Sequence, residues 1–166
     1  MSNTITFTLD GKEVDAQSNE TIWQISNRQG TEIPHLCYRN ATDYRGDGNC
    51  RACVVEVEGE KALSASCIRR PESGMVVHTA SNRAQKSRNM VMELLLADQS
   101  EPEGEFKHWL QEMNIHESRM PSRPRVDEDH SHPAISVDLN KCIHCQLCIQ
   151  ACREIQGNDV IGMAAR

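Results

Sequence analysis

The sequence predicts an α+β fold, in which a small mixed sheet covered by one helix is followed by a helical linker and a short cysteine-bearing segment. Strand-like alternation and turn signals fill the first 80 residues of the 166-residue chain. Two stretches with helical periodicity come next, and the eight cysteines form two separate groups of four. We therefore expect three parts, at residues 1–80, 81–133 and 134–166.

The first part opens with a hairpin and a helix. Residues 4–9 alternate as a strand, Asp10-Gly11 is a strong two-residue turn signal, and residues 12–16 form the returning strand. Thr21 is suited to cap the helix that follows, and Gly30 is suited to end it. The opening of the chain therefore predicts a hairpin with one helix after it.

A second hairpin and a closing strand complete the first part. Residues 54–58 and 61–66 are expected to be strands joined by a turn at Gly59-Glu60, and residues 75–79 form a last short strand. The order is hairpin, helix, cysteine loop, hairpin and closing strand. A β-grasp ferredoxin domain needs this order, because one helix then covers a small mixed sheet.

The first cysteine group lies in the loops of this part. The loop at 46–53 contains two glycines and two of the four cysteines. Backbone N–H groups must come close to the sulfurs of an anionic cluster, and glycine has no Cβ to prevent that approach. Such hydrogen bonds help to set a cluster's reduction potential. The alternative is a surface loop whose glycines serve turn geometry alone.

The linker is predicted to contain two helices and an extended tether. Ser81 is suited to cap a helix that runs to about Leu96, with the packing face Met90, Val91, Leu94 and Leu95. A shorter helix follows, with the packing face Phe106, Trp109, Leu110 and Met113. Residues 115–133 are rich in proline and charge, which predicts the tether. Without cysteine or a regular ligand spacing nearby, three tether histidines are expected to be solvated surface groups: His116, His130 and His132.

The second cysteine group has the most specific spacing in the chain. It follows a short strand predicted at 134–139 and consists of Cys142, Cys145, Cys148 and Cys152. The pattern C-x2-C-x2-C-x3-C is the one by which bacterial ferredoxins hold [4Fe–4S] clusters, the fourth cysteine ligating a second cluster. Arg153 stands where the ferredoxin run carries proline. A structural zinc site is the alternative, but zinc sites of this kind use two C-x2-C pairs.

Composition and charge limit the class of protein. The formal net charge of −6 disfavours a nucleic-acid partner. No apolar run approaches the length of a membrane-spanning helix, and the amino terminus lacks the basic and apolar regions of a secretory signal. We therefore expect a reducing, cytoplasmic compartment in which the cysteines are metal-bound thiolates rather than disulfides. No residue is a candidate general acid, general base or nucleophile.

The first cysteine group has the spacing C-x12-C-x2-C-x13-C and resembles a [2Fe–2S] domain shared by three kinds of subunit. These are the large iron–sulfur subunit of respiratory complex I, the small diaphorase-side subunit of NAD-reducing hydrogenases, and the catalytic subunit of NAD-dependent molybdenum or tungsten formate dehydrogenases. The matching segments are residues 32–37, 48–53 and 66–67. Residues 131–139 and 148–163 are similar to the formate dehydrogenase subunit in particular.

This resemblance implies the electron-transfer module of an NAD-dependent formate dehydrogenase. The implied [2Fe–2S] ligands are Cys37, Cys50, Cys53 and Cys67. The implied [4Fe–4S] ligands are Cys142, Cys145 and Cys148, with Cys152 on the same cluster or on a second one. In the full enzyme the resemblance implies a second [4Fe–4S] cluster and a molybdopterin catalytic domain or subunit with molybdenum or tungsten. It further implies a diaphorase partner that binds FMN and NAD.

Two features depart from the family pattern. Complex I and the hydrogenase subunit carry between these domains a further cluster held by one histidine and three cysteines. Residues 68–141 contain no cysteine, so we expect that cluster to be absent. No second cubane motif or molybdopterin domain follows, which favours a fragment over a stand-alone subunit. The alternatives are the electron-relay subunit of an NAD-reducing hydrogenase or complex I-like enzyme, and a zinc-stapled interaction module without a redox role.

Overall fold

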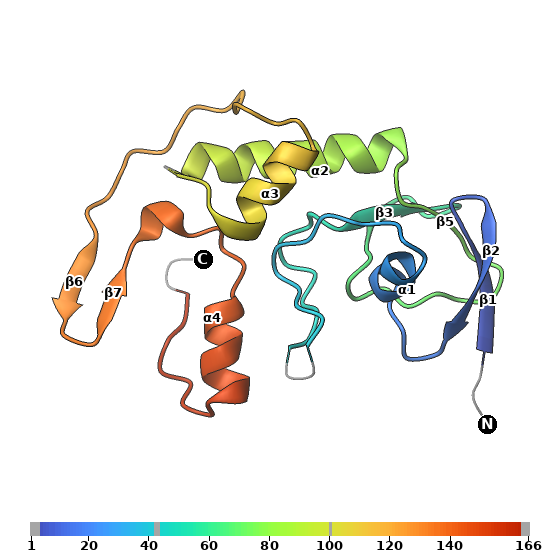
Figure 1. The fold of residues 1–166 in the computed structure, drawn as a ribbon, viewed down its shortest axis with the longest axis horizontal. Coiled ribbons are helices and arrows are strands. Elements are labelled where there is room, and N and C mark those ends of the chain that lie inside the picture. The colour runs from blue at the N-terminus through green and yellow to red at the C-terminus, as the bar shows by residue number, and fades with distance from the viewer. Residues whose placement is uncertain (1–3, 42–43, 100, 164–166) are drawn as a thin grey trace.

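A computed structural model describes residues 4–41, 44–99 and 101–163 and has the predicted α+β fold (Figure 1). The strands and helices of the first part are β1 (Thr4–Leu9), β2 (Lys12–Gln17), α1 (Ile22–Arg28), β3 (Val54–Val57), β4 (Ser64–Ala65) and β5 (Val76–His78). The remaining elements are α2 (Asn82–Asp98), α3 (Gly104–Glu112), β6 (Asp129–His132), β7 (Ile135–Val137), the 3-10 turn η1 (Leu139–Lys141), α4 (Leu147–Gln150) and the π-helical turn η2 (Ala151–Ile155). Every element predicted from the sequence has a counterpart here.

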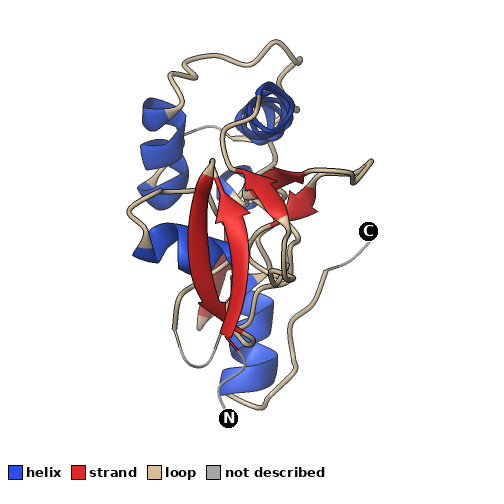
Figure 2. Cartoon of the chain, turned by 90° about the vertical axis from the view of Figure 1, so that its right-hand side faces the viewer, coloured by secondary structure: helices blue, strands red, loops and turns tan. Residues whose placement is uncertain are grey.

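Five strands form one mixed sheet in the order β2-β1-β5-β3-β4. The turn between β1 and β2 is the predicted Asp10-Gly11, and its positive φ angles of 49° and 80° are those of a two-residue hairpin turn. β5 pairs in parallel with β1 and antiparallel with β3. The closing strand therefore enters the middle of the sheet and joins the two hairpins, while the helices lie beside and behind the strands (Figure 2).

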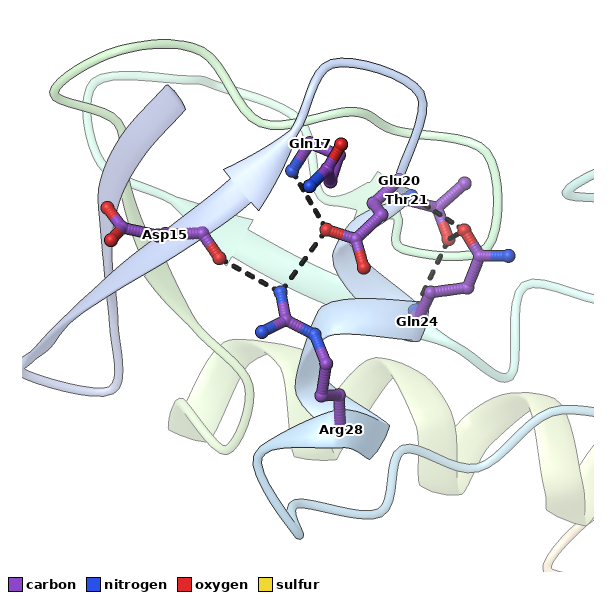
Figure 3. A network of polar contacts seen from close by, with 6 residues as sticks. All are labelled: Asp15, Gln17, Glu20, Thr21, Gln24 and Arg28. Atoms are coloured by element: carbon purple, nitrogen blue, oxygen red, sulfur yellow. Dashed lines mark hydrogen bonds and ion pairs between the residues drawn. The ribbon is translucent and has the colours of Figure 1, made fainter. Parts of the chain in front are cut away.

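Polar contacts fix α1 to the first hairpin. The Thr21 hydroxyl accepts a hydrogen bond from the Gln24 N–H at 3.3 Å, and the Gln24 side chain accepts one from the Thr21 N–H at 2.9 Å. This capping box confirms the predicted start of the helix. Arg28 in the last turn donates to the Asp15 carbonyl at 2.9 Å and pairs with Glu20 at 3.2 Å (Figure 3). Because both ends are held, α1 presents its apolar side to the sheet.

Two hydrophobic cores meet at the first cysteine group. The first core lies between α1 and the sheet and includes Cys53 and Cys67 among its buried residues. The second core is built from α2, α3 and the cysteine loop, through Leu36, Ala52, Met92, Phe106, Trp109 and Leu110. Cys50 packs, partly buried, against this second core. The loop that carries the cysteines is therefore enclosed from two sides.

The packing face of α2 differs from the predicted one. Ser81 caps the helix as expected, but Met90 and Leu94 are 37% and 49% exposed. The buried residues of α2 are instead Ala84, Arg88, Met92 and Ala97. Backbone carbonyls of the neighbouring chain segments accept hydrogen bonds from Arg88, so a charged residue occupies the middle of the buried stripe. No helix in the described part of the chain is both long and apolar enough to cross a membrane.

The tether at 115–133 runs over α2 and ends in a hairpin (Figure 1). Arg119 pairs with Glu93 of α2 at 2.6 Å, and the Arg123 N–H donates to the Ala97 carbonyl at 3.1 Å. Near its end the predicted tether forms strand β6, which pairs with β7. The three tether histidines are exposed, as the sequence predicts. These contacts hold the extended segment against α2.

Candidate metal centres

The four cysteines of the first group come from three separate loops around the sheet. Cys37 follows α1 in an extended segment, Cys50 and Cys53 lie in the loop before β3, and Cys67 follows β4. Cys37, Cys53 and Cys67 are at most 2% exposed, and Cys50 is half-buried. All four are free thiols. The fold therefore shields this group from water on most sides.

The four thiols lie close enough to shift one another's pKa. The pKa of Cys37 is strongly lowered because the thiols of Cys50 and Cys67 donate to it, and the backbone N–H groups of Cys50 and Asn49 add to the effect. The Cys50 nitrogen lies 3.3 Å from the Cys37 Sγ. The pKa of Cys53 is lowered chiefly by the Cys67 thiol, so two of the four positions already favour a thiolate.

These four residues fit a two-iron cluster. Among the residues that the structure describes, no three His, Cys, Asp or Glu side chains converge on the position of a single metal ion. A [2Fe–2S] cluster spreads four thiolates over two irons. Four buried or half-buried cysteines from three loops, with the Cys50 N–H directed at the Cys37 sulfur, fit such a cluster. The assignment of all four as ligands remains a prediction.

The glycines of the cysteine loop also allow a close approach to the segment that carries Cys67. A Cβ on Gly46 would lie 2.5 Å from the Cys67 carbonyl oxygen, and one on Gly48 would lie 2.8 Å from the Ile68 side chain. Gly48 also has a φ of 62°, which disfavours other residues. The glycines therefore let the loop pack against the segment that carries Cys67.

We expect Gly46→Ala to lower the thermal stability of the chain. The added methyl group meets a backbone oxygen that cannot turn aside, and overpacking of this kind costs about 1–3 kcal/mol. Gly162→Ala is the matched control, because nothing lies within 4 Å of a Cβ at that position. Thermal unfolding of anaerobically purified protein measures both. Equal midpoints for the two variants would contradict the close approach.

The second group lies on a loop and the helix after it. Cys142 and Cys145 are in the loop after η1, Cys148 is in α4, and Cys152 is in η2. His144 and Gln146 on either side of Cys145 have φ angles of 53° and 64°. This left-handed backbone turns the Leu147 N–H toward the Cys145 sulfur. Burial raises the pKa of Cys145.

Cys145 also borders a cavity, which is lined by apolar, acidic and basic side chains. The cavity has a volume of about 220 Å³ and is lined on one side by Leu36, Ile143 and Leu147. Cys142 and Cys148 further raise the pKa of Cys145 electrostatically, so the three cysteines of the C-x2-C-x2-C run lie near one another. Their residue types and local backbone fit an iron–sulfur cluster. The different role predicted for Cys152 remains a prediction.

The two cysteine groups are docked on each other. The Asn49 Nδ2 atom donates to the His144 carbonyl at 2.7 Å, and the Gln150 side chain donates to the Arg45 carbonyl at 3.3 Å. Arg45 pairs with Glu154 of η2 at 3.0 Å. Cys37 raises the pKa of Cys145, so the groups are within electrostatic reach. The sequence carries no signal for this contact, which joins residues 95 positions apart.

We expect Asn49→Ala to loosen the docked second group. The substitution leaves the partly buried His144 carbonyl without this donor, at a cost of about 1–3 kcal/mol. Hydrogen–deuterium exchange should rise at residues 142–150 and in the loop around Cys50, while the sheet stays protected. Asn158→Ala, on the exposed segment after η2, serves as the control. Unchanged exchange in Asn49→Ala would show that Gln150 and Arg45 suffice.

Sequence reasoning missed two further residues beside the first group. His35 packs against Trp23, with ring centroids 4.6 Å apart, and its Nε2 lies 2.9 Å from the Glu105 carboxylate. Arg88 is buried under the cysteine loop. His35 stands in a segment that already matched a known pattern, but the pattern assigns it no role. For Arg88 no sequence signal exists, because the apolar periodicity of α2 points to another face.

Comparison with known proteins identifies the first part at the level of a domain. Residues 2–82 match the family described as 2Fe-2S iron-sulfur cluster binding domain. An NADH-quinone oxidoreductase subunit of Rickettsia bellii is 30% identical over 175 residues, which is 98% of this chain and 25% of that protein. A Bacillus subtilis protein named "Putative formate dehydrogenase YrhE" is 28% identical over 172 residues, covering 96% of this chain and 17% of its own length.

A solved structure has the same arrangement. A chain in the crystal structure of an NAD+-reducing [NiFe]-hydrogenase in the H2-reduced state superposes with a TM-score of 0.83 at 27% identity. The match covers 98% of this chain and 71% of that one. This chain thus spans about a quarter or less of the length of these curated relatives, but most of the matched hydrogenase chain.

Proposed function

Since residues 2–82 match the 2Fe-2S iron-sulfur cluster binding domain family, we propose that this chain is the iron–sulfur electron-transfer module of an NAD-linked formate dehydrogenase. The observation that carries electron transfer is the docking of the two cysteine groups through Asn49 and His144. When bound, the two clusters supply one-electron transfer. The protein does no bond-making chemistry. It holds, shields and orients the clusters.

Each structural feature of the two groups has a part in this function. Burial of Cys37, Cys53 and Cys67 excludes water, and N–H donors to the sulfurs compensate negative charge. Asn49 keeps the second group against the first. The proposed ligands of the [2Fe–2S] cluster are Cys37, Cys50, Cys53 and Cys67. Those of the [4Fe–4S] cluster are Cys142, Cys145 and Cys148, with Cys152 in a separate role.

Two observations support formate as the electron source. One curated relative carries the name "Putative formate dehydrogenase YrhE". In addition, residues 68–141 contain no cysteine, whereas the complex I and hydrogenase subunits in the family resemblance hold a further cluster there. The proposed partners are a molybdopterin catalytic domain or subunit with molybdenum or tungsten, and a diaphorase subunit with FMN and NAD. The proposed compartment is the cytoplasm.

The second candidate is the electron-relay subunit of an NAD-reducing hydrogenase. Its support is the solved structure, because the chain covers 71% of that hydrogenase chain and a much smaller share of the other relatives. The missing cysteines between the two groups count against it. The two candidates share the same clusters and differ in the electron donor.

The test uses the enzyme that contains this chain, purified anaerobically. Iron and sulfide analysis with low-temperature EPR should find a [2Fe–2S] signal and a faster-relaxing cubane signal. Stoichiometric zinc without clusters would overturn electron transfer altogether. Formate and NADH should each reduce the clusters, and H2 should not. Reduction by H2 but not by formate would replace the first candidate with the second.

A further inference from the structure

Arg88 is a buried cation beside the first cysteine group that the proposed function does not use. Its side chain is 6% exposed, in the middle of α2. The Nε and Nη2 atoms donate to the Val54 carbonyl at 2.9 Å and 2.7 Å, and Nη2 also donates to the Thr79 carbonyl at 2.6 Å. All of these acceptors are neutral. A guanidinium keeps its charge in proteins, so a full positive charge lies inside the fold.

A buried charge costs several kcal/mol unless an opposite charge compensates it. None of the ion pairs among the described residues includes Arg88. Burial lowers the pKa of Arg88, and the thiolate of Cys53 and the carboxylate of Asp10 raise it again. The Asp10 carboxylate also accepts hydrogen bonds from the N–H and hydroxyl of Thr79, at 2.7 Å and 2.6 Å. Of the two anions Cys53, which directly precedes Val54, has the larger effect on the pKa of Arg88.

A purely structural role would explain the three hydrogen bonds but not the charge. Neutral donors also satisfy backbone carbonyls, and they do so without the cost of burying a cation. A cation is explained by the position of Arg88, which donates to the carbonyl of the residue directly after Cys53. Thiolate-bound clusters carry net negative charge, and charge, hydrogen bonds and burial around them set the reduction potential.

We propose that Arg88 is the counter-charge of the first cysteine site and raises the reduction potential of the [2Fe–2S] cluster held there. The inference rests on the proposed function. One-electron reduction adds one negative charge to the cluster, while the guanidinium keeps its proton throughout. Attraction across a region with little water is strong, so the cation stabilises the reduced form more than the oxidised form. Arg88 acts through the electrostatic field and touches no reacting atom, and is therefore a tuning residue.

The test is an EPR-monitored redox titration of the full chain with its clusters. Arg88→Gln keeps an amide donor and removes the charge. We expect its [2Fe–2S] cluster to bind the electron about tenfold more weakly, equivalent to about 59 mV for one electron. Arg83→Gln removes the same charge five residues earlier on α2, where the guanidinium is exposed and pairs with Glu56 at 3.3 Å. This control should keep the wild-type potential.

Arg88→Lys is the second test variant. If Arg88→Gln does not retain its cluster, the potential of Arg88→Lys alone tests the proposal. It preserves the charge, so its potential should stay near that of the wild type, and a tenfold loss would overturn the proposal. An intact signal with an unchanged potential in Arg88→Gln would also overturn it, as would an equal shift in Arg83→Gln. A wild-type chain without any reducible [2Fe–2S] signal would overturn the proposed function and this inference together.

Discussion

Cys50→Ser is expected to abolish the [2Fe–2S] signal and to leave the first part of the chain sensitive to protease. Cys50 lies at the meeting point of the two cores, and its N–H donates to the Cys37 sulfur at 3.3 Å. The cores are small and mostly aliphatic, and three of the four cysteines of the first group lie in or against them. Binding energy at metal–thiolate sites is part of folding energy, on the order of 10 kcal/mol for structural zinc. Loss of one ligand should therefore destabilise the fold of this part.

Limited proteolysis followed by mass spectrometry measures this effect. Cleavage is expected first in residues 37–67, because these loops depend on the cluster for their shape. The cubane signal should survive in Cys50→Ser, since its cysteines lie on another segment. Apo-protein that resists protease as well as the cluster-bound form does would show that apolar packing alone stabilises this part.

Cys145→Ser is expected to remove the cubane signal completely, whereas Cys152→Ser should retain part of it. Cys145 stands between two left-handed residues, receives the Leu147 N–H and borders the cavity beside Leu36. Cys152 lies in the π-helical turn η2, and its carbonyl accepts the Asn158 N–H at 3.0 Å. In two-cluster ferredoxins the fourth cysteine of this run ligates a different cluster.

The comparison is made by EPR and iron content on anaerobically prepared variants of the 166-residue chain. We also expect its cubane to be labile in oxygen, because the fourth ligand of the first three cysteines is expected from another cysteine run. Equal and complete loss in both variants, with a robust cluster in the parent, would show that all four cysteines bind one cube. The [2Fe–2S] signal is the internal control in every variant.

Local signals were sufficient for the secondary structure. Asp10-Gly11 has the two positive φ angles of a hairpin turn, and Thr21 and Ser81 cap their helices. These features depend on neighbours a few residues away, so the sequence states them directly. Cysteine spacing likewise predicted two groups, because the spacing within each group is typical of iron–sulfur ligands. The [2Fe–2S] binding domain then matched residues 2–82.

Long-range packing decided the rest. Apolar periodicity on α2 favoured Met90 and Leu94, yet the buried stripe has Arg88 at its centre, because the Val54 and Thr79 carbonyls accept hydrogen bonds from its guanidinium. Helix periodicity ranks residues by hydrophobicity and cannot register hydrogen-bond acceptors on a distant segment. The Asn49–His144 contact is of the same kind. Sequence alone determined that this chain carries two groups of four cysteines. Only the tertiary structure decided that the segments carrying the two groups are in contact, and that Arg88 is buried against the residue after Cys53. Both facts depend on groups that are far apart in the chain.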